Sequence, residues 1–426
     1  MGIRPGARLR RPARAAICVT LSALALGAVA ASSSASTVAG DDGTHEAIFV
    51  GNNWDGTADV IIPRSHGRYE TVAEIDIIPD IQERLTEILT DPVRLGYFLA
   101  IQQLIGEGHD QYVDDMYTSP DGRLLIVSRP SLADVVAIRL RTGGIAWRFP
   151  VAGQRSDHMA LSPDGRQVAV SASTGNVVHI LDVRTGEEVD QFPSGDSPHE
   201  NTYSKDGERL YHASIGQVYT PLDQPLVDST KGERVFEVVD TDGYDVVETV
   251  DMGEKLEEAG YPDMSSAVRP MALSPNERKV YFQVSFFHGF AEYSFKRDEV
   301  TRVKELPNLV PDMPREQYLL DSAHHGIAMD GRGRTLCVAG TMDDYVAMVS
   351  RRSFDYKLLK NLGTKPYWST TSRDGRRCYV SWSGTDSLSV ISYRTGKEIA
   401  HIPVGDHPQR VRTGDVRSSW LRAQRG

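Results

Sequence analysis

The stretch Asp157–Asp196, "DHMALSPDGRQVAVSASTGNVVHILDVRTGEEVDQFPSGD", decides the fold. The alternation of apolar and polar residues in "QVAVSA", "NVVHILDV" and "EEVDQFP" is typical of β-strands. The Ser-Pro-Asp-Gly and Thr-Gly sequences are typical of tight turns, because Pro, Asp and Gly each favour one position of a type I turn. The stretch therefore predicts four short strands in about 40 residues, which is the signature of one β-propeller blade.

The same unit recurs along the chain. Residues 376–406, "RRCYVSWSGTDSLSVISYRTGKEIAHIPVGD", repeat it almost position for position. Similar turns lie at Ser119–Gly122, Ser162–Gly165, Ser204–Gly207, Ser274–Glu277, Asp330–Gly333 and Ser372–Gly375. They predict six units that begin near residues 114, 154, 197, 265, 321 and 365.

A seventh unit is divided between the chain ends. Residues 407–414 begin like a unit and stop, while residues 45–76 carry the pattern of the three missing strands. Pairing the two ends would close the ring and remove exposed sheet edges. The predicted fold is thus an all-β, seven-bladed propeller over residues 45–414, followed by a C-terminal tail, 415–426.

The first 40 residues have the composition of a secretory signal peptide and a flexible leader. A basic segment precedes the apolar run "AAICVTLSALALGAVAA" and small residues; its arginines are Arg4, Arg8, Arg10, Arg11 and Arg14. The apolar run is short for a membrane span. We therefore expect a secreted or extracytoplasmic protein without a stable membrane anchor after cleavage. Cys337 and Cys378 remain; in an oxidising compartment they could pair, and two buried free thiols are equally compatible with the sequence.

The charge of the chain argues against nucleic acid as a partner. Removal of the five N-terminal arginines takes the formal net charge from −11 to about −16. A protein this acidic repels the phosphate backbone of nucleic acids. Metabolites and small ligands are better partners for it.

The repeats resemble the YVTN or YncE-like family of seven-bladed propellers. The resemblance rests on "SPDG", "VVHILDVRTGEEV" and "SLSVISYRTGKEIAHIPVGDHP", and it covers the chain after the signal peptide. It implies the propeller fold. The family includes binding proteins, lactonase-like enzymes and uncharacterised exported proteins, so the resemblance does not assign an activity.

Four extensions of the repeat belong to one face of the predicted disc, which we call the lid face. In a four-stranded blade, the loops that enter the first strand and those that join the second to the third share a face. A helical insertion, residues 78–113, and residues 215–232, 254–264 and 309–320 all occupy such loops. Long loops are unusual in compact domains unless they bind or cover something.

Titratable residues recur at the start of each predicted first strand, on the same face. Counting back from the turns aligns Asp114 and Asp115, Asp157 and His158, His199 and Glu200, Arg269 and Pro270, His325 and Gly326, and Tyr367 and Trp368. His324 precedes His325, and His407 and Arg410 stand at comparable places in the divided blade. Each alone would be an ordinary polar group, but their convergence predicts a pocket at the mouth of the central channel.

Two kinds of chemistry fit these residues. In the first, a divalent metal ion is bound by imidazoles and carboxylates, and the candidate ligands are His158, His199, His324, His325, Glu200 and Asp157. In the second, Arg269 and Arg410 bind a substrate carboxylate and a histidine paired with an acid is the general base. No Gly-x-Ser-x-Gly or His-Glu-x-x-His motif indicates a common hydrolase.

The pattern favours an enzyme that performs metal-assisted elimination or hydrolysis on a small anionic or carbonyl-containing, sugar-acid-like molecule. The candidate catalytic residues are His199, Glu200, His325, Tyr367 and Arg269. The candidate substrate-binding residues are Arg410, Trp368, Trp54, His288 and Asp115. The alternative is a non-catalytic exported propeller that binds a ligand or a protein.

Overall fold

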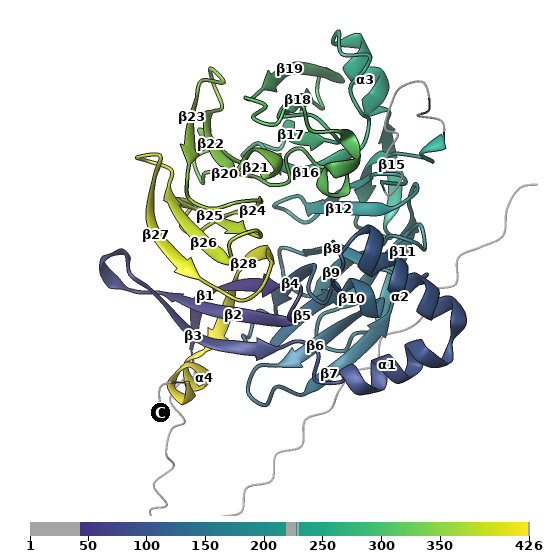
Figure 1. The fold of residues 1–426 in the computed structure, drawn as a ribbon, viewed down its shortest axis with the longest axis vertical. Helices are drawn as coiled ribbons and strands as arrows, with labels where there is room; N and C mark the ends of the chain where they lie inside the picture. The colour runs from purple at the N-terminus through teal and green to yellow at the C-terminus, as the bar shows by residue number, and fades with distance from the viewer. Residues whose placement is uncertain (1–42, 219–226, 228–229, 425–426) are drawn as a thin grey trace, which may run out of the picture. The chain divides into compact units, whose positions relative to one another are not determined.

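Seven four-stranded antiparallel sheets account for the repeats in the computed structural model, which describes residues 43–218, 227 and 230–424 (Figure 1). The first complete blade consists of β4 (Asp115–Thr118), β5 (Leu124–Arg129), β6 (Asp134–Arg139) and β7 (Ile145–Pro150). The second consists of β8 (Ser156–Leu161), β9 (Gln167–Ala172), β10 (Val177–Asp182) and β11 (Glu188–Pro193). The third consists of β12 (Pro198–Tyr203), β13 (Arg209–Ser214), β14 (Phe236–Asp240) and β15 (Asp245–Val250).

The next three blades follow the same order. They consist of β16 (Val268–Leu273), β17 (Lys279–Val284), β18 (Gly289–Ser294) and β19 (Glu299–Glu305); β20 (Ile327–Met329), β21 (Thr335–Gly340), β22 (Tyr345–Ser350) and β23 (Tyr356–Lys360); and β24 (Pro366–Thr371), β25 (Arg377–Trp382), β26 (Ser387–Ser392) and β27 (Lys397–Pro403). The predicted seven-bladed propeller is confirmed.

The chain ends close the ring as predicted. In the divided blade, β28 (Pro408–Arg417) pairs with β1 (Thr44–Asn52), which continues to β2 (Thr57–Pro63) and β3 (Tyr69–Asp76). The strand β28 passes the boundary expected at Gly414, and a short helix, α4 (Ser418–Ala423), follows it. The Trp420 indole is buried and donates a hydrogen bond to the Leu140 carbonyl, so the folded body includes this helix.

The recurring turns have the chemistry that the sequence predicts. In the turn between β8 and β9, the Ser162 hydroxyl donates to Asp164 over 2.7 Å, and the Gly165 amide donates to the Ser162 carbonyl over 2.8 Å. The φ of Gly165 is +70°, a value that favours glycine. Each such turn aligns two strands, whose apolar side chains pack against the neighbouring sheet.

The first strands of the blades stand side by side around the channel. Each contacts the first strand of the next blade, in the cyclic order β28, β4, β8, β12, β16, β20 and β24. Four of them have an irregularity near their first residues, where the pairing register shifts between Ser156 and Met159, Pro198 and Glu200, Val268 and Met271, and Pro366 and Ser369. A bulge changes the direction of side chains. These bulges fall at the titratable positions that are found by aligning the repeats on their turns.

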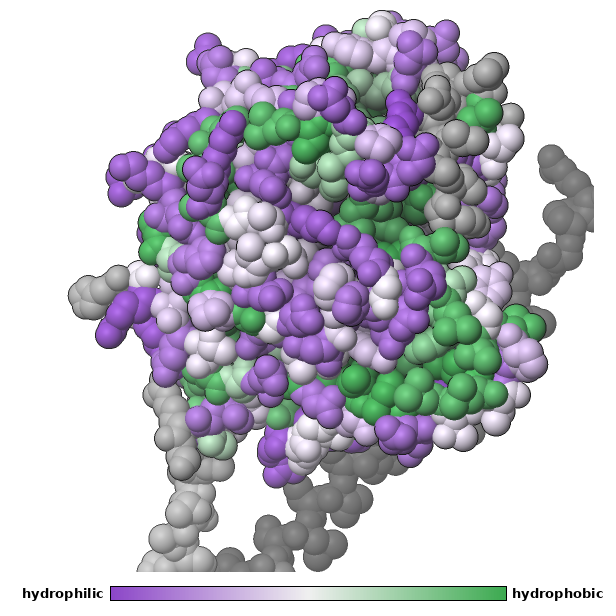
Figure 2. Space-filling model, in the orientation of Figure 1, coloured by the Kyte–Doolittle hydropathy of each residue, from purple (hydrophilic) through white to green (hydrophobic). Residues whose placement is uncertain are grey.

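The insertion after β3 forms two helices. Helix α1 (Ile81–Thr90) and helix α2 (Pro92–Leu104) meet at Asp91, whose carboxylate accepts hydrogen bonds from the Val93 and Arg94 amides and caps α2. Figure 2 shows an apolar patch over these helices, and its exposed large residues are Leu89, Val93, Tyr97, Leu99 and Leu104. A third helix, α3 (Met252–Glu258), overlaps the predicted 254–264 extension and begins two residues before it.

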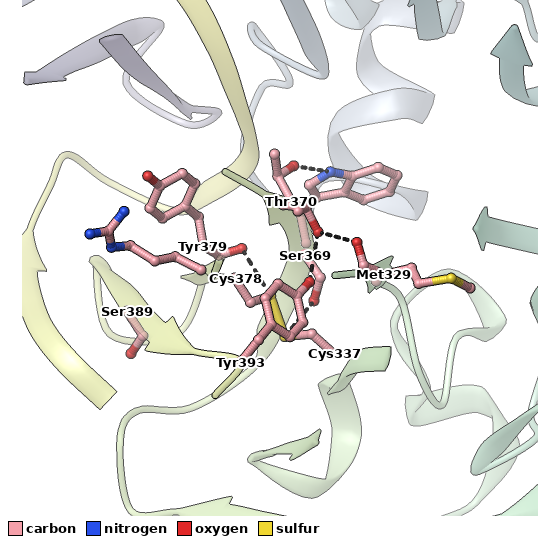
Figure 3. The surroundings of a disulfide bond; sticks show 12 residues. Met329, Cys337, Ser369, Thr370, Cys378, Tyr379, Ser389 and Tyr393 are labelled. Atoms are coloured by element: carbon pink, nitrogen blue, oxygen red, sulfur yellow. Dashed lines mark hydrogen bonds between the residues drawn. A yellow bond between two sulfur atoms is a disulfide. The ribbon is translucent and has the colours of Figure 1, made fainter. Parts of the chain in front are cut away.

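Cys337 of β21 and Cys378 of β25 form a disulfide bond, with their Cα atoms 6.5 Å apart (Figure 3). The bond joins two neighbouring blades in a buried environment, so pairing is the alternative that the structure adopts. The predicted signal peptide and leader, residues 1–40, lie outside the described residues, as does part of the 215–232 extension. Among the helices of the described residues, none has the length and apolar character needed to cross a membrane.

Candidate metal site

Three histidines from different blades meet in the channel. His158, His199 and His325 each offer a ring nitrogen, and the three nitrogens lie within 4.8 Å of one another. The ring centroids of His158 and His199 are 3.7 Å apart, and that of His325 is 5.7 Å and 5.6 Å from them. We call these residues the channel cluster. All three are buried, so their side chains face each other rather than solvent.

The bulges explain how the channel cluster forms. His158 lies inside the irregular register between Ser156 and Met159, and His199 lies inside the one between Pro198 and Glu200. In a regular strand, successive side chains alternate between the two faces of the sheet. The bulge removes this alternation locally, so that Asp157 and His158, adjacent in sequence, both line the same cavity.

Glu200 orients one member of the channel cluster. Its carboxyl oxygen Oε2 lies 2.8 Å from Nδ1 of His158, and both groups are buried. This hydrogen bond fixes the orientation of the imidazole ring, so that Nε2 faces the other polar groups of the channel. Nε2 lies 3.5 Å from Asp157 and 4.0 Å from Asp114, so two carboxylates also border it.

A small cavity adjoins the channel cluster on the lid face. Its volume is about 20 Å³, which is room for about one water molecule or one ion. Its walls include His158, His199 and polar groups that the sequence also singles out, namely Asp114, Asp157, Arg269 and Tyr367. Ile105, Ile215, Val218 and Leu320 cover it, and they come from three of the four predicted extensions. The extensions therefore close the channel over the cluster.

Arginines surround the cavity, and each has an acidic, carbonyl or aromatic neighbour. The Arg269 guanidinium donates to the Leu320 carbonyl over 2.6 Å and so ties the cover to the channel wall. Arg155 donates to Asp157, and Arg410 donates to the Asp114 carbonyl over 2.9 Å. Arg410 also stacks 3.6 Å from the centroid of the Trp368 ring, and its Nη1 has no hydrogen-bond partner among the described residues.

Burial keeps the imidazoles neutral. It lowers the pKa of His158, His199 and His325 well below the usual value, and the positive charge of nearby arginines or of the other imidazoles lowers the pKa further. Neutral imidazole is the form that binds a metal. Burial also raises the pKa of Asp114 to about 7 and that of Glu200 to about 8, although Arg410 opposes both shifts.

The donor atoms of the channel cluster fit a divalent metal ion. Nδ1 of His199 and Nδ1 of His325 are buried and have no hydrogen-bond partner among the described residues. An unpaired polar atom in the interior is costly. Neutral imidazoles beside carboxylates are the donor set that zinc and similar ions prefer.

A second, wider cavity enters the channel from the opposite face, where the repeat turns lie. Its volume is about 600 Å³, and its walls include Pro163 and Lys205 of two turns. Glu200, Trp368 and Arg412 line it as well. Glu200 therefore connects this open cavity to His158 and, through it, to the channel cluster.

His324, a candidate metal ligand, does not belong to the channel cluster, and neither does His288, a candidate substrate-binding residue. They meet Asp343 instead, in a separate buried group. His324 and His325 are adjacent in an extended segment, where neighbouring side chains point to opposite sides. One therefore faces the channel and the other faces away from it.

Trp54 and Asp115 also take other positions than expected. Trp54 stacks between His109 and His407, with ring centroids 3.8 Å and 3.9 Å away, and it lines neither channel cavity. Asp115 accepts two hydrogen bonds from Arg412, over 2.9 Å and 2.7 Å, and is buried in that ion pair. The Asp115–Arg412 pair joins the neighbouring blades of β4 and β28, whereas the Trp54 stack packs the β1–β2 loop against the segments that precede β4 and β28.

Sequence reasoning missed Arg155 and Asp343. Arg155 stands two residues before Asp157, just outside the positions aligned on the turns, and its proximity to them was the available signal. Asp343 lies in the loop between β21 and β22. That loop is on the lid face, as is the loop that carries His288, so the predicted blade topology contained the signal.

Comparisons with known proteins support the fold and give no activity. No protein-family model matches the chain, and no curated protein matches it. Among solved structures, hydrazine synthase of Kuenenia stuttgartiensis is similar with a TM-score of 0.53 and 15% sequence identity, over 70% of this chain and 88% of that one. At this identity the similarity concerns the fold alone.

Proposed function

We propose that this protein binds a divalent metal ion at the channel cluster and is an enzyme that acts on a small anionic or carbonyl-containing molecule. The observation that carries the proposal is the convergence of three buried, neutral imidazoles within 4.8 Å. His158, His199 and His325 would hold the ion, which when bound supplies a Lewis acid for elimination or hydrolysis. Water in the adjoining cavity would complete its coordination.

The surrounding residues have roles that follow from their contacts. Glu200 is a positioning residue, because its hydrogen bond to Nδ1 of His158 holds the imidazole ring in one orientation. Arg410, with Nη1 unpaired, supplies positive charge for a substrate carboxylate. Burial raises the pKa of Tyr367, so its hydroxyl stays protonated and can donate a hydrogen bond to a bound substrate.

Substrate binding on the lid face would require the cover to move. The closed cavity of about 20 Å³ has no room for a sugar acid, whereas small-molecule sites usually have several hundred cubic ångströms. Leu320 follows Tyr318 and Leu319 in a segment without regular strands, and its φ is +47°. Opening of this segment and of residues 215–218 would admit the substrate to the channel cluster.

We also propose that the chain is an exported member of a YVTN-like repeat family. The basic and apolar N-terminal sequence supports export, and the buried disulfide between Cys337 and Cys378 is consistent with an oxidising compartment. A second candidate function is a propeller that binds a protein partner without catalysis. The exposed apolar patch on α1 and α2 favours it.

Metal analysis and turnover test the proposed function together. After loading with Zn²⁺, the His199→Ala variant is expected to bind one equivalent fewer than the wild type. His401→Ala is the control, because His401 is an exposed histidine bonded to Glu398, and this variant should keep the wild-type metal content. Turnover of uronic-acid substrates, followed by absorbance of the conjugated product, should disappear in His199→Ala. Equal metal content in His199→Ala and the wild type would refute the channel cluster as a metal site.

A further inference from the structure

A second group of donor atoms lies on the other side of the segment that carries His325. Nδ1 of His288 is 2.6 Å from Oδ2 of Asp343, and Nε2 of His324 is 2.9 Å from the same oxygen. All three side chains are buried. His288 follows β17, His324 precedes β20 and Asp343 precedes β22, so the group joins two neighbouring blades.

Neighbouring polar groups hold these three side chains in place. The Tyr318 hydroxyl is 2.9 Å from Nε2 of His288, and the Leu309 amide donates to Oδ1 of Asp343 over 2.7 Å. Oδ2 is thereby left for the two imidazoles. Outer contacts of this kind fix the orientation of metal ligands, because each ligand presents one defined atom to the ion.

A tyrosine hydroxyl provides a fourth polar atom near the group. Tyr345 donates its proton to the Pro307 carbonyl over 2.9 Å, which leaves its oxygen lone pairs for other partners. That oxygen lies 3.2 Å from Nε2 of His324. Two imidazole nitrogens and one carboxylate oxygen thus lie within 4.8 Å of one another, and the Tyr345 oxygen adjoins one of these nitrogens.

The charge of Asp343 is compatible with a bound cation. Its carboxylate is buried, and its two ion-pair partners in the described chain are both histidines, His288 and His324. Burial of a carboxylate charge is costly unless a cation compensates it.

We propose that His288, His324 and Asp343 form a second binding site for a divalent transition-metal ion of the zinc class, separate from the channel cluster. The ion would bind Nδ1 of His288 and Nε2 of His324, so each ring would carry its proton on the other nitrogen. For His288 that proton meets the Tyr318 hydroxyl. Two imidazoles and a carboxylate are a donor set that such ions accept.

The site has a structural role, because it holds the cover of the channel. Asp343 bonds the Leu309 amide and His288 bonds Tyr318, and both contacts anchor the 309–320 extension. Leu320, at the end of this extension, lines the cavity above the channel cluster. The second ion therefore keeps this cover closed and does not touch the substrate.

Titration with metal tests the second site. Purified full-length protein is stripped with a chelator, dialysed and titrated with Zn²⁺ alone, and bound metal is measured. We expect two equivalents in the wild type, one in Asp343→Asn, one in His199→Ala and none in the double variant. Zinc should also slow proteolysis within residues 309–320 of His199→Ala, and it should have no such effect on the double variant.

The outcomes separate the two sites. The wild type could bind a single equivalent of zinc. If Asp343→Asn then binds none and His199→Ala still binds one, the result supports the second site and refutes the channel cluster as a metal site. If the wild type and Asp343→Asn each bind one equivalent and His199→Ala binds none, the second site is overturned. If Asp343→Asn fails to fold, His288→Gln replaces it, and retention of two equivalents in that variant would equally overturn the proposal.

Discussion

Glu200 is a buried carboxyl group between the channel cluster and the open cavity of the opposite face. Burial raises its pKa to about 8, above the value of 4.5 for an exposed glutamate, and Arg410 and Arg412 lower it only in part. The folded state thus holds this proton more tightly than the unfolded state. The resulting stabilisation is complete below pH 4.5 and is lost as the pH rises through about 8.

We therefore predict that the free energy of unfolding of the metal-free protein falls between pH 6.5 and pH 9, and that it falls less in Glu200→Gln. Asp114, with a pKa raised to about 7, contributes in the same direction, so the slope should decrease in the variant without vanishing. Urea unfolding at a series of pH values, with a chelator present, measures the free energy of unfolding of both proteins. Equal slopes in both proteins would contradict the assignment.

The channel histidines show what a single sequence can reveal about individual residues. Counting back from the turns brought out His158, His199 and His325, because each repeat places one of two adjacent positions at the channel. It failed for His324, which lies one residue away and faces the opposite side. The bulges were not predictable, since register depends on both paired strands and a single strand does not specify it.

The disulfide is the covalent link between elements of two neighbouring blades, β21 and β25. Its cysteines are 41 positions apart, so it closes a large loop of the unfolded chain. Loss of this constraint should lower the free energy of unfolding by about 4 kcal/mol on the chain-entropy estimate. The sequence alone did not show whether the two cysteines pair, because nothing in it indicates which side chains face each other across two blades.

We predict that Cys337→Ala combined with Cys378→Ala keeps the propeller and the metal content, and lowers the unfolding temperature. Chemical denaturation of the wild type with and without reductant provides the matched comparison, because reduction removes the bond and keeps both sulfur atoms. The account would be wrong if the reduced and oxidised proteins unfolded at the same denaturant concentration. Metal content should be unchanged, since both cysteines lie outside the two histidine groups.

At the scale of the whole molecule, the repeat turns and the divided seventh unit were enough to predict seven blades and their closure. Local turn chemistry and strand alternation act within each blade, so they can be read from a short stretch. The sizes of the two cavities could not be predicted in this way. Their sizes depend on side chains from many blades, and the open cavity of about 600 Å³ faces away from the extensions.

The most direct measurement of the central claim is anomalous X-ray scattering from crystals of the zinc-loaded protein. Data collected on both sides of the zinc absorption edge locate each bound ion. The account predicts a peak between His158, His199 and His325, and a second peak beside Asp343. Full occupancy of other positions with no peak among the three channel histidines would contradict it.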